Sequence, residues 1–168
     1  MADSLVRRTH ARDAPASRRI PLLRTYTATT TSSARPAAVL AVLTDPDAVA
    51  RWAPVDFYVD DLTHARLSEG SRARVSGRLA GQRVGFDVEV HQADEGGLAL
   101  SADGPVALDV AYELRADAGG GSEVSASVAV LPRRGLRARL LAEATAAVLA
   151  SGALQHALGR IVAEAAAA

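Results

Sequence analysis

Residues 133–168 read RRGLRARLLAEATAAVLASGALQHALGRIVAEAAAA, and this stretch decides the fold that we expect. It contains no proline and is rich in alanine and leucine, which favour helix. At 100° per residue, one side of such a helix is apolar and the other is polar. We therefore expect one long amphipathic helix, well above the average length of about 11–12 residues. The apolar side holds Leu136, Leu140, Ala144, Ala147, Ser151, Leu154, Leu158 and Ile161, and the polar side holds Arg139, Thr145, His156, Arg160 and Glu164.

The apolar side of this helix has leucine at its ends but only alanine or serine in its middle. A sheet packed against it would therefore meet too little side chain at its centre. Either large sheet residues such as Phe86 and Tyr112 fill that space, or it stays hollow. Such a hollow is empty, filled with water or occupied by a ligand. Because unfilled volume costs roughly 24 cal/mol per Å³, we infer a ligand-sized pocket.

The sequence upstream of this helix predicts an antiparallel sheet. Apolar and polar residues alternate in several runs, so that every second residue from Val84 to Val90 is apolar. Short turns containing glycine separate the runs, which is typical of a meander. Two short helices are expected at residues 36–43 and 47–52, each beginning next to a proline. The expected strands are residues 24–33, 55–66, 72–79, 83–91, 98–101, 106–115 and 123–131.

Composition and charge limit the classes of function. The chain has 168 residues, 49% of them hydrophobic, which suffices for one domain with a hydrophobic core. Its 19 arginines balance 19 acidic residues, and this zero net charge argues against a nucleic-acid-binding protein. Without cysteine there is no disulfide and no thiol nucleophile. No apolar run approaches the roughly 20 residues that cross a bilayer, so we expect a cytoplasmic protein.

The beginning of the chain differs in charge from the remainder. Residues 1–24 hold six arginines against two aspartates, a net charge of +4, and the remainder carries −4. Residues 1–22 show little hydrophobic periodicity, so we expect a flexible arginine-rich tail there. One ligand-binding domain is expected at residues 23–168. The tail could also contact anionic lipid or an acidic partner.

Residues suited to catalysis or metal binding do not form a recognisable site in the sequence. His91 shares its side of a strand with acidic residues, and His156 lies on the polar side of the helix. We interpret the acidic group Asp56, Asp60 and Asp61 as a hydrated edge rather than a cation site. No histidine pair has metal-ligand spacing, and no nucleophile elbow or phosphate-binding glycine loop is present. We therefore expect no catalytic residue, no metal and no cofactor.

Four short motifs precede the C-terminal helix in a characteristic order. They are SARPAAV at 33–39, LTDP at 43–46, ARWAP at 50–54 and LSEGS at 67–71. This combination resembles the START-domain superfamily, also called SRPBCC, which includes the polyketide cyclase/dehydrase and lipid-transport family. The resemblance covers roughly residues 24–165. It implies an α+β helix-grip fold, in which a seven-stranded antiparallel sheet wraps around a long C-terminal helix, with two short helices between the first and second strands.

The resemblance also implies a cavity between sheet and helix that receives an apolar small molecule. We therefore expect binding or transport of an apolar or amphipathic ligand such as a lipid, an isoprenoid or a polyketide, with Tyr112 and Ser151 orienting its polar end. Two alternatives stay open: a polyketide cyclase or aromatase that uses Tyr112, Tyr58 or a threonine of the first strand, and a protein-interaction module with a vestigial cavity. Trp52 either guards the cavity mouth or fixes the helical connector to the sheet. The expected ligand-binding residues are Trp52, Tyr58, Val75, Phe86, Val88, Leu100, Leu108, Val110, Tyr112, Ala144, Ala147, Ser151 and Leu154.

Overall fold

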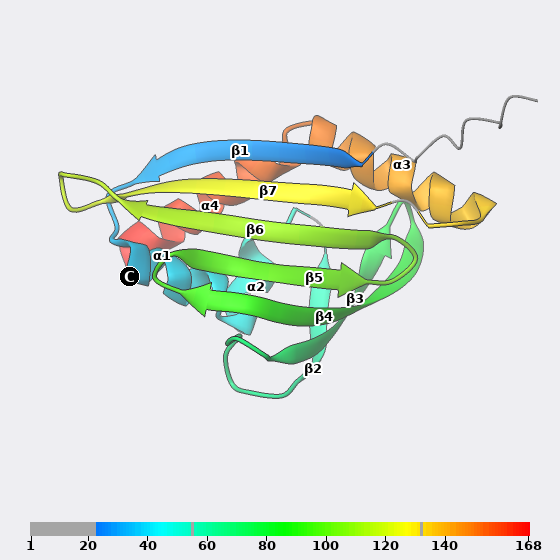
Figure 1. Cartoon of the computed structure of the whole chain (residues 1–168), viewed down its shortest axis with the longest axis horizontal. Helices are drawn as coiled ribbons and strands as arrows, with labels where there is room; N and C mark the ends of the chain where they lie inside the picture. The colour runs from blue at the N-terminus through cyan, green and yellow to red at the C-terminus, as the bar shows by residue number, and fades with distance from the viewer. Residues whose placement is uncertain (1–22, 55, 132) are drawn as a thin grey trace, which may run out of the picture.

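The computed structural model describes residues 23–54, 56–131 and 133–168. The tail expected at residues 1–22 lies outside the described residues. Within them, one strand, two helices, six strands and two further helices follow one another (Figure 1). The elements are β1 (Arg24–Ser32), α1 (Pro36–Leu43), α2 (Pro46–Trp52), β2 (Phe57–Leu62), β3 (Arg72–Leu79), β4 (Gln82–Asp94), β5 (Gly97–Asp103), β6 (Ala107–Ala116), β7 (Ser122–Leu131), α3 (Leu136–Ala150) and α4 (Ala153–Ala167).

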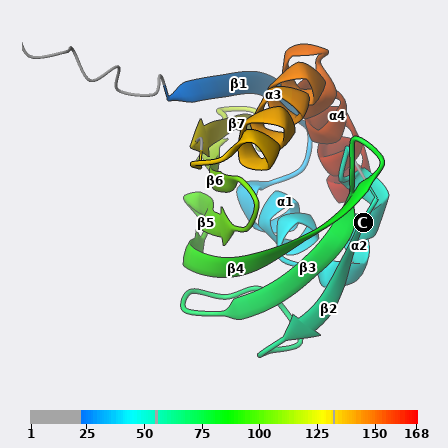
Figure 2. The same cartoon turned by 90° about the vertical axis from the view of Figure 1, so that its right-hand side faces the viewer.

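All seven strands form one antiparallel sheet in the order β1-β7-β6-β5-β4-β3-β2. The first strand of the chain pairs with the last strand along its whole length, and the remaining neighbours are consecutive hairpins. Figure 2 shows that the sheet curves strongly, with the helices on its concave side. The predicted fold class is therefore confirmed.

Alternation along the strands directs their apolar residues to the concave side. In β4, Val84, Phe86 and Val90 are buried, and the residues between them are exposed or only partly buried. The strand register shifts between Val59 and Asp61 in β2, and again in the middle of β4. Such bulges bend a strand and increase its twist, which helps the sheet to curve around the helices.

The two short helices between β1 and β2 follow the proline signals of the sequence. Pro36 begins α1, and Pro46 begins α2, because proline tolerates the first turn of a helix. The carboxylate of Asp45 accepts a hydrogen bond of 3.0 Å from the backbone N–H of Asp47 and so caps α2. Leu43 at the end of α1 is fully buried. The pair of helices thus closes one end of the concave side.

The C-terminal stretch is not one continuous helix, which corrects the sequence analysis. It breaks after Ala150, and α3 and α4 differ in direction by 57°. Gly152 adopts φ of +89°, a left-handed conformation that glycine reaches without steric cost and that commonly ends helices. Because helical periodicity continues across residues 133–168, the sequence analysis did not identify Gly152 as the end of a helix. Within the described residues no single helix is long and apolar enough to span a membrane, and only α3 and α4 together, despite their bend, meet that length and composition.

The predicted apolar stripe is buried in α4 but not in α3. Leu154, Leu158 and Ile161 are at most 6% exposed. By contrast, Leu136 and Leu140 are 75% and 63% exposed. The side of α3 that faces the sheet instead carries Leu141, Ala142, Thr145 and Ala146.

Both sides of α3 are apolar, so its pattern alone did not fix which side would be buried. Thr145, which was assigned to the polar side, is buried. Its hydroxyl donates a hydrogen bond of 2.8 Å to the carbonyl of Leu141. Because this hydroxyl is hydrogen-bonded, burial of the threonine avoids the free-energy cost of an unpaired polar group.

Candidate functional site: an apolar cavity under the sheet

The concave side of the sheet encloses a cavity of about 240 Å³. Strands β3 to β6 supply one wall, and helices α2, α3 and α4 supply much of the other. Five inward-facing sheet residues are only partly buried, because they border the hollow. They are Val75, Val88, Leu100, Leu108 and Val110.

The cavity approaches the surface between the α2–β2 connection and the edge of the sheet. Pro54 is an exposed member of the lining, and Phe57 and Val59 of β2 are partly buried. The ring of Phe57 lies over Gly77 of β3, where a Cβ atom would come within 2.4 Å of Phe57 Cδ1. Phe57 also meets Phe86 edge to face, with ring centroids 6.0 Å apart. These aromatic contacts shape the entrance side of the cavity.

Uncharged side chains form the whole described lining of the cavity. The polar side-chain groups of the lining residues are the hydroxyls of Tyr112 and Thr145 and the indole N–H of Trp52. The Thr145 hydroxyl is already bonded to the helix backbone. The indole N–H of Trp52 is buried without a hydrogen-bond partner among the described residues. The cavity therefore offers a ligand little beyond apolar surface.

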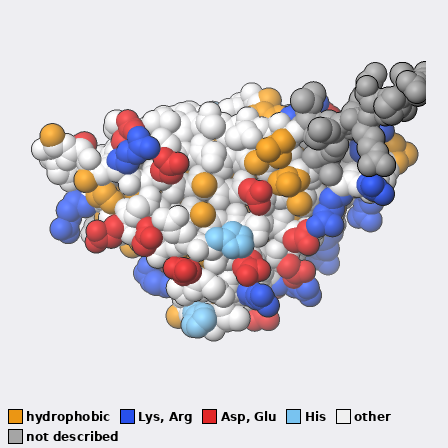
Figure 3. Space-filling view, viewed as in Figure 1, with side chains coloured by type: hydrophobic (Ala, Val, Ile, Leu, Met, Phe, Trp, Pro, Cys, Tyr) orange, Lys and Arg blue, Asp and Glu red, His pale blue; other side chains and the backbone are white. Residues whose placement is uncertain are grey.

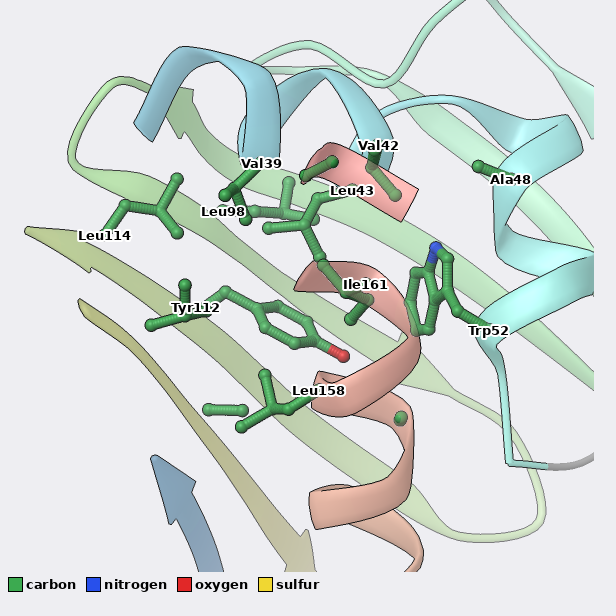
Figure 4. Close-up of a cluster of buried hydrophobic side chains, with 14 of the residues drawn as sticks. Val39, Val42, Leu43, Ala48, Trp52, Leu98, Tyr112, Leu114, Leu158 and Ile161 are labelled. Carbon is green, nitrogen blue, oxygen red and sulfur yellow. The ribbon is translucent and has the colours of Figure 1, made fainter. Parts of the chain in front are cut away.

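Tyr112 of β6 belongs to the lining of the cavity and packs between the sheet and α4. Its ring meets that of Trp52 edge to face, with centroids 6.1 Å apart and an interplanar angle of 77°. Figure 4 shows its hydroxyl directed towards Trp52, with Leu158 of α4 beside the ring. Burial raises the pKa of Tyr112 above its usual value, because the phenolate would lose its hydration. The side chain is therefore a neutral phenol at physiological pH.

Of the two roles that the sequence left open for Trp52, the structure supports the one in which it fixes the helical connector to the sheet. It is 8% exposed and belongs to the main cluster of buried side chains, so it fixes the helical connector to the core. It also forms part of the cavity lining. Trp52 is the last residue of α2, and its indole therefore lies between the connector and the hollow.

The structure brings together nine of the thirteen residues that were expected to contact a ligand. Trp52, Val75, Phe86, Val88, Leu100, Leu108, Val110, Tyr112 and Leu154 line the cavity. The other four, Tyr58, Ala144, Ala147 and Ser151, are not part of its lining.

Each of the four misplaced residues has a local explanation. Tyr58 is 66% exposed because alternation in β2 turns its neighbours Phe57 and Val59 inwards. Ala144 and Ala147 lie outside the buried side of α3 that faces the sheet. Ser151 is exposed at the bend, where its hydroxyl donates a hydrogen bond of 2.7 Å to the carbonyl of Val148.

Sequence reasoning missed lining residues in several regions, including the helical connector, where Leu43, Pro46 and Val49 line the cavity. Phe57 and Val59 could have been found by applying the alternation rule to β2, as was done for the other strands. Val148 and Leu149 line the cavity from α3. Their inward position depends on how α3 is rotated about its axis at the bend at Gly152. Sequence periodicity does not specify this rotation.

Histidines and serines of the described residues lie away from the cavity lining. Two serine–histidine pairs in this part of the chain have the contact expected of a nucleophile and its base, and the first is Ser71 and His64, with 3.5 Å between Oγ and Nδ1. Ser71 is fully buried, and its hydroxyl also contacts the Ser68 hydroxyl at 2.8 Å, so it stabilises the loop before β3. His91 is exposed on its strand, as expected, and its Nε2 lies 2.9 Å from Ser101 Oγ. No cluster of three or more potential metal ligands occurs among the described residues.

A curved antiparallel sheet closed over C-terminal helices, with an apolar hollow between them, defines the helix-grip class of proteins. The family model for polyketide cyclase/dehydrase and lipid transport matches residues 24–166, and the chain belongs to this family. The family resemblance inferred from the sequence is thereby confirmed. No curated protein sequence matches the chain.

Several solved structures share this fold at low sequence identity. The aromatase/cyclase Zhui from Streptomyces sp. R1128 is 17% identical, with a TM-score of 0.66 over 86% of this chain and 94% of that chain. TTHA0849 from Thermus thermophilus is 15% identical, with a TM-score of 0.64 over 86% and 98% of the two chains. A START superfamily protein from Mycobacterium smegmatis is 19% identical, with a TM-score of 0.54 over 82% and 96%. At these identities the likeness establishes the fold alone.

Proposed function

We propose that the protein binds an apolar or amphipathic small molecule in the cavity between the sheet and the C-terminal helices. The observation that carries this proposal is the uncharged, almost wholly hydrocarbon lining of a cavity of about 240 Å³. A buried water needs two to four polar partners, and this lining supplies few. An apolar ligand instead gains about 25 cal/mol for each Å² of surface that it buries.

The size of the cavity indicates the size of the ligand. It is larger than the engineered apolar cavities of about 150 Å³ that accept benzene, and it is slightly smaller than typical drug-sized sites of about 300–1,000 Å³. A small ring system or a short acyl segment suits this volume, and a longer molecule would extend past Pro54. If left empty, 240 Å³ would cost on the order of 6 kcal/mol, so filling it should stabilise the fold markedly.

Tyr112 is the polar group best placed to orient the ligand. As a neutral phenol it can donate a hydrogen bond to a carbonyl or hydroxyl oxygen of a ligand. Of the residues considered for a cyclase, namely Tyr112, Tyr58 and the threonines of β1, only Tyr112 belongs to the described lining of the cavity. General acids work best with a pKa near the working pH, and burial shifts the pKa of Tyr112 in the opposite direction. The uncharged lining of the cavity, together with the raised pKa of Tyr112, therefore supports binding better than catalysis.

A pair of neighbouring substitutions on β6 tests the proposal. Val110→Phe adds volume inside the cavity, whereas Asp109→Phe adds the same ring at an exposed position of the same strand. We expect the apolar fluorophore N-phenylnaphthylamine to bind the native protein and the Asp109→Phe variant with equal affinity. Binding to Val110→Phe should fall at least tenfold. Native mass spectrometry of the purified protein should show an apolar molecule that co-purifies with all but the Val110→Phe variant.

The outcome that would contradict the proposal is equally specific. If the fluorophore binds Val110→Phe and native protein alike, its site lies outside the cavity. If neither the fluorophore nor any co-purifying mass is found, the cavity does not serve as a ligand site. Thermal unfolding of both variants provides the control for folding.

A further inference from the structure

The first turns of α3 present an apolar surface to solvent. Leu136 and Leu140 are 75% and 63% exposed, and their separation of one helical turn makes them neighbours on the same side. Leu23, 58% exposed, precedes Arg24, whose guanidinium pairs with Glu143 of α3 at 2.9 Å. Three of the four large apolar side chains that are most exposed among the described residues therefore gather at one end of the molecule. Single exposed leucines are ordinary in soluble proteins, whereas such clustering is not.

Arginines surround these leucines. Arg133 pairs with Asp103, but Arg134, Arg137 and Arg139 form no salt bridge with a carboxylate in the part of the chain that the structure describes. Figure 3 shows blue side chains gathered at the end of the molecule where α3 begins. We call the leucines and these last three arginines, namely Leu23, Leu136, Leu140, Arg134, Arg137 and Arg139, the α3 patch.

Two further arginines extend the positive charge below the α3 patch. Arg78 and Arg83 face each other across the β3–β4 hairpin. Leu79 of this hairpin shares a buried cluster with Leu141 of α3, so the hairpin lies directly under the helix. Like charges in opposite positions of a strand pair repel each other. An anionic surface would relieve that repulsion.

We propose that the α3 patch docks the protein on an anionic lipid bilayer. A helix segment with leucines flanked by arginines suits the boundary between headgroups and acyl chains. The leucines would enter the apolar region, and the arginine stems would lie along it while their guanidinium groups bind phosphates. The occupant follows from charge complementarity: a second copy would bring arginine against arginine, which disfavours a symmetric contact between copies.

The position of α3 relates this surface to the cavity. Thr145, Val148 and Leu149 in the second half of the same helix line the cavity. A helix of 15 residues is about 22 Å long, so a bilayer bound at the α3 patch lies within that distance of the cavity wall. The docking proposal itself does not require a ligand in the cavity, and the two proposals can therefore fail separately.

Co-sedimentation of the full chain with lipid vesicles tests the proposal. One set of vesicles contains phosphatidylcholine alone, and in the other set a third of the lipid is phosphatidylserine. We expect binding to the phosphatidylserine vesicles that weakens as salt is raised, and little binding to phosphatidylcholine alone. The triple variant Arg134→Gln, Arg137→Gln and Arg139→Gln should lower the affinity about a hundredfold.

Two further variants separate the contributions of the α3 patch. Leu136→Ser with Leu140→Ser should also lower the affinity at least tenfold, because it removes the inserting side chains but no charge. The matched control replaces three arginines of the exposed sheet surface by glutamine, namely Arg72, Arg74 and Arg115, and should retain binding within about threefold. All these positions are exposed, and thermal unfolding should confirm that each variant remains folded.

Three results would overturn the proposal. The first is the absence of binding to phosphatidylserine vesicles. The second is binding that survives both α3 variants but is lost when the five arginines within residues 1–22 are replaced by glutamine in the full chain, since the contact would then belong to that segment. The third is a concentration-dependent dimer in sedimentation experiments that Leu136→Ser with Leu140→Ser abolishes while vesicle binding is unchanged, which would assign the leucines to a second copy.

Discussion

The two C-terminal helices have the same length of 15 residues but use their apolar residues differently. In α4, Leu158 and Ile161 are completely buried, because α1, α2 and β1 pack around it. In α3, Leu136 and Leu140 face solvent, and the opposite side covers the cavity. The comparison teaches that apolar residues at helical spacing identify the buried side of a helix only if the opposite side is polar. Where both sides are apolar, as in α3, the neighbouring elements decide.

The largest test of this comparison is a matched pair of leucine truncations. Leu158→Ala in α4 should lower the free energy of unfolding by about 2–5 kcal/mol, because it leaves a void in a packed core. Leu140→Ala in α3 should change it by no more than about 0.5 kcal/mol. Urea denaturation measures both. Equal losses would show that α3 is packed as firmly as α4 and would invalidate the contrast.

A second test concerns Tyr112, whose ring packs beside α4. Its pKa is raised in the folded state, so folded molecules retain the phenolic proton where unfolded molecules lose it. This contribution to stability is complete below the unfolded pKa of about 10 and is lost as pH rises above it, at about 1.4 kcal/mol per pH unit. We expect Tyr112→Phe to flatten the decline of unfolding free energy between about pH 10 and 12. An unchanged decline would mean that the hydroxyl is hydrated.

The smallest test addresses the joint between the two helices. Gly152→Ala should lower the free energy of unfolding by about 1–2 kcal/mol, because alanine disfavours the left-handed conformation with φ of +89°. Gly159→Ala in α4 is the matched control with opposite sign. A Cβ there meets no atom within 4 Å, and alanine in a helix interior gains about 0.8–1.0 kcal/mol over glycine. Thermal unfolding should show the two shifts in opposite directions, and a shift of the same sign would argue against the bend.

Much of the fold was predictable from the sequence because its signals are local. Strict alternation identified the strands, and prolines marked both short helices. The pairing of β1 with β7, which completes the sheet, was not predicted, since long-range register leaves no periodic signal. The bend at Gly152 was missed because Ser151 fits the apolar stripe by size, and periodicity does not record backbone conformation.

The candidate site was predictable on its sheet side and not on its helix side. Val88 and Val110 follow from the alternation of strands, whose inward side is fixed once the fold is known. Thr145 and Leu149 face the cavity only because α3 is rotated at the bend. Tyr58 was included because it carries a hydroxyl, although alternation in β2 turns it outwards. Its exposure shows that strand alternation, and not the chemistry of a side chain, decides which residues reach the cavity.

The outer border of β2 has one further consequence. β2 is an edge strand, with a partner on one side only. The free edge of such a strand, next to an apolar hollow, can pair with a strand of a neighbouring molecule. Three exposed carboxylates, those of Asp56, Asp60 and Asp61, stand along that border, and the register shift at Asp60 distorts it. A second molecule that approaches this edge of the sheet therefore meets negative charge and an irregular row of hydrogen-bonding groups. Both features oppose growth of the sheet into fibrils.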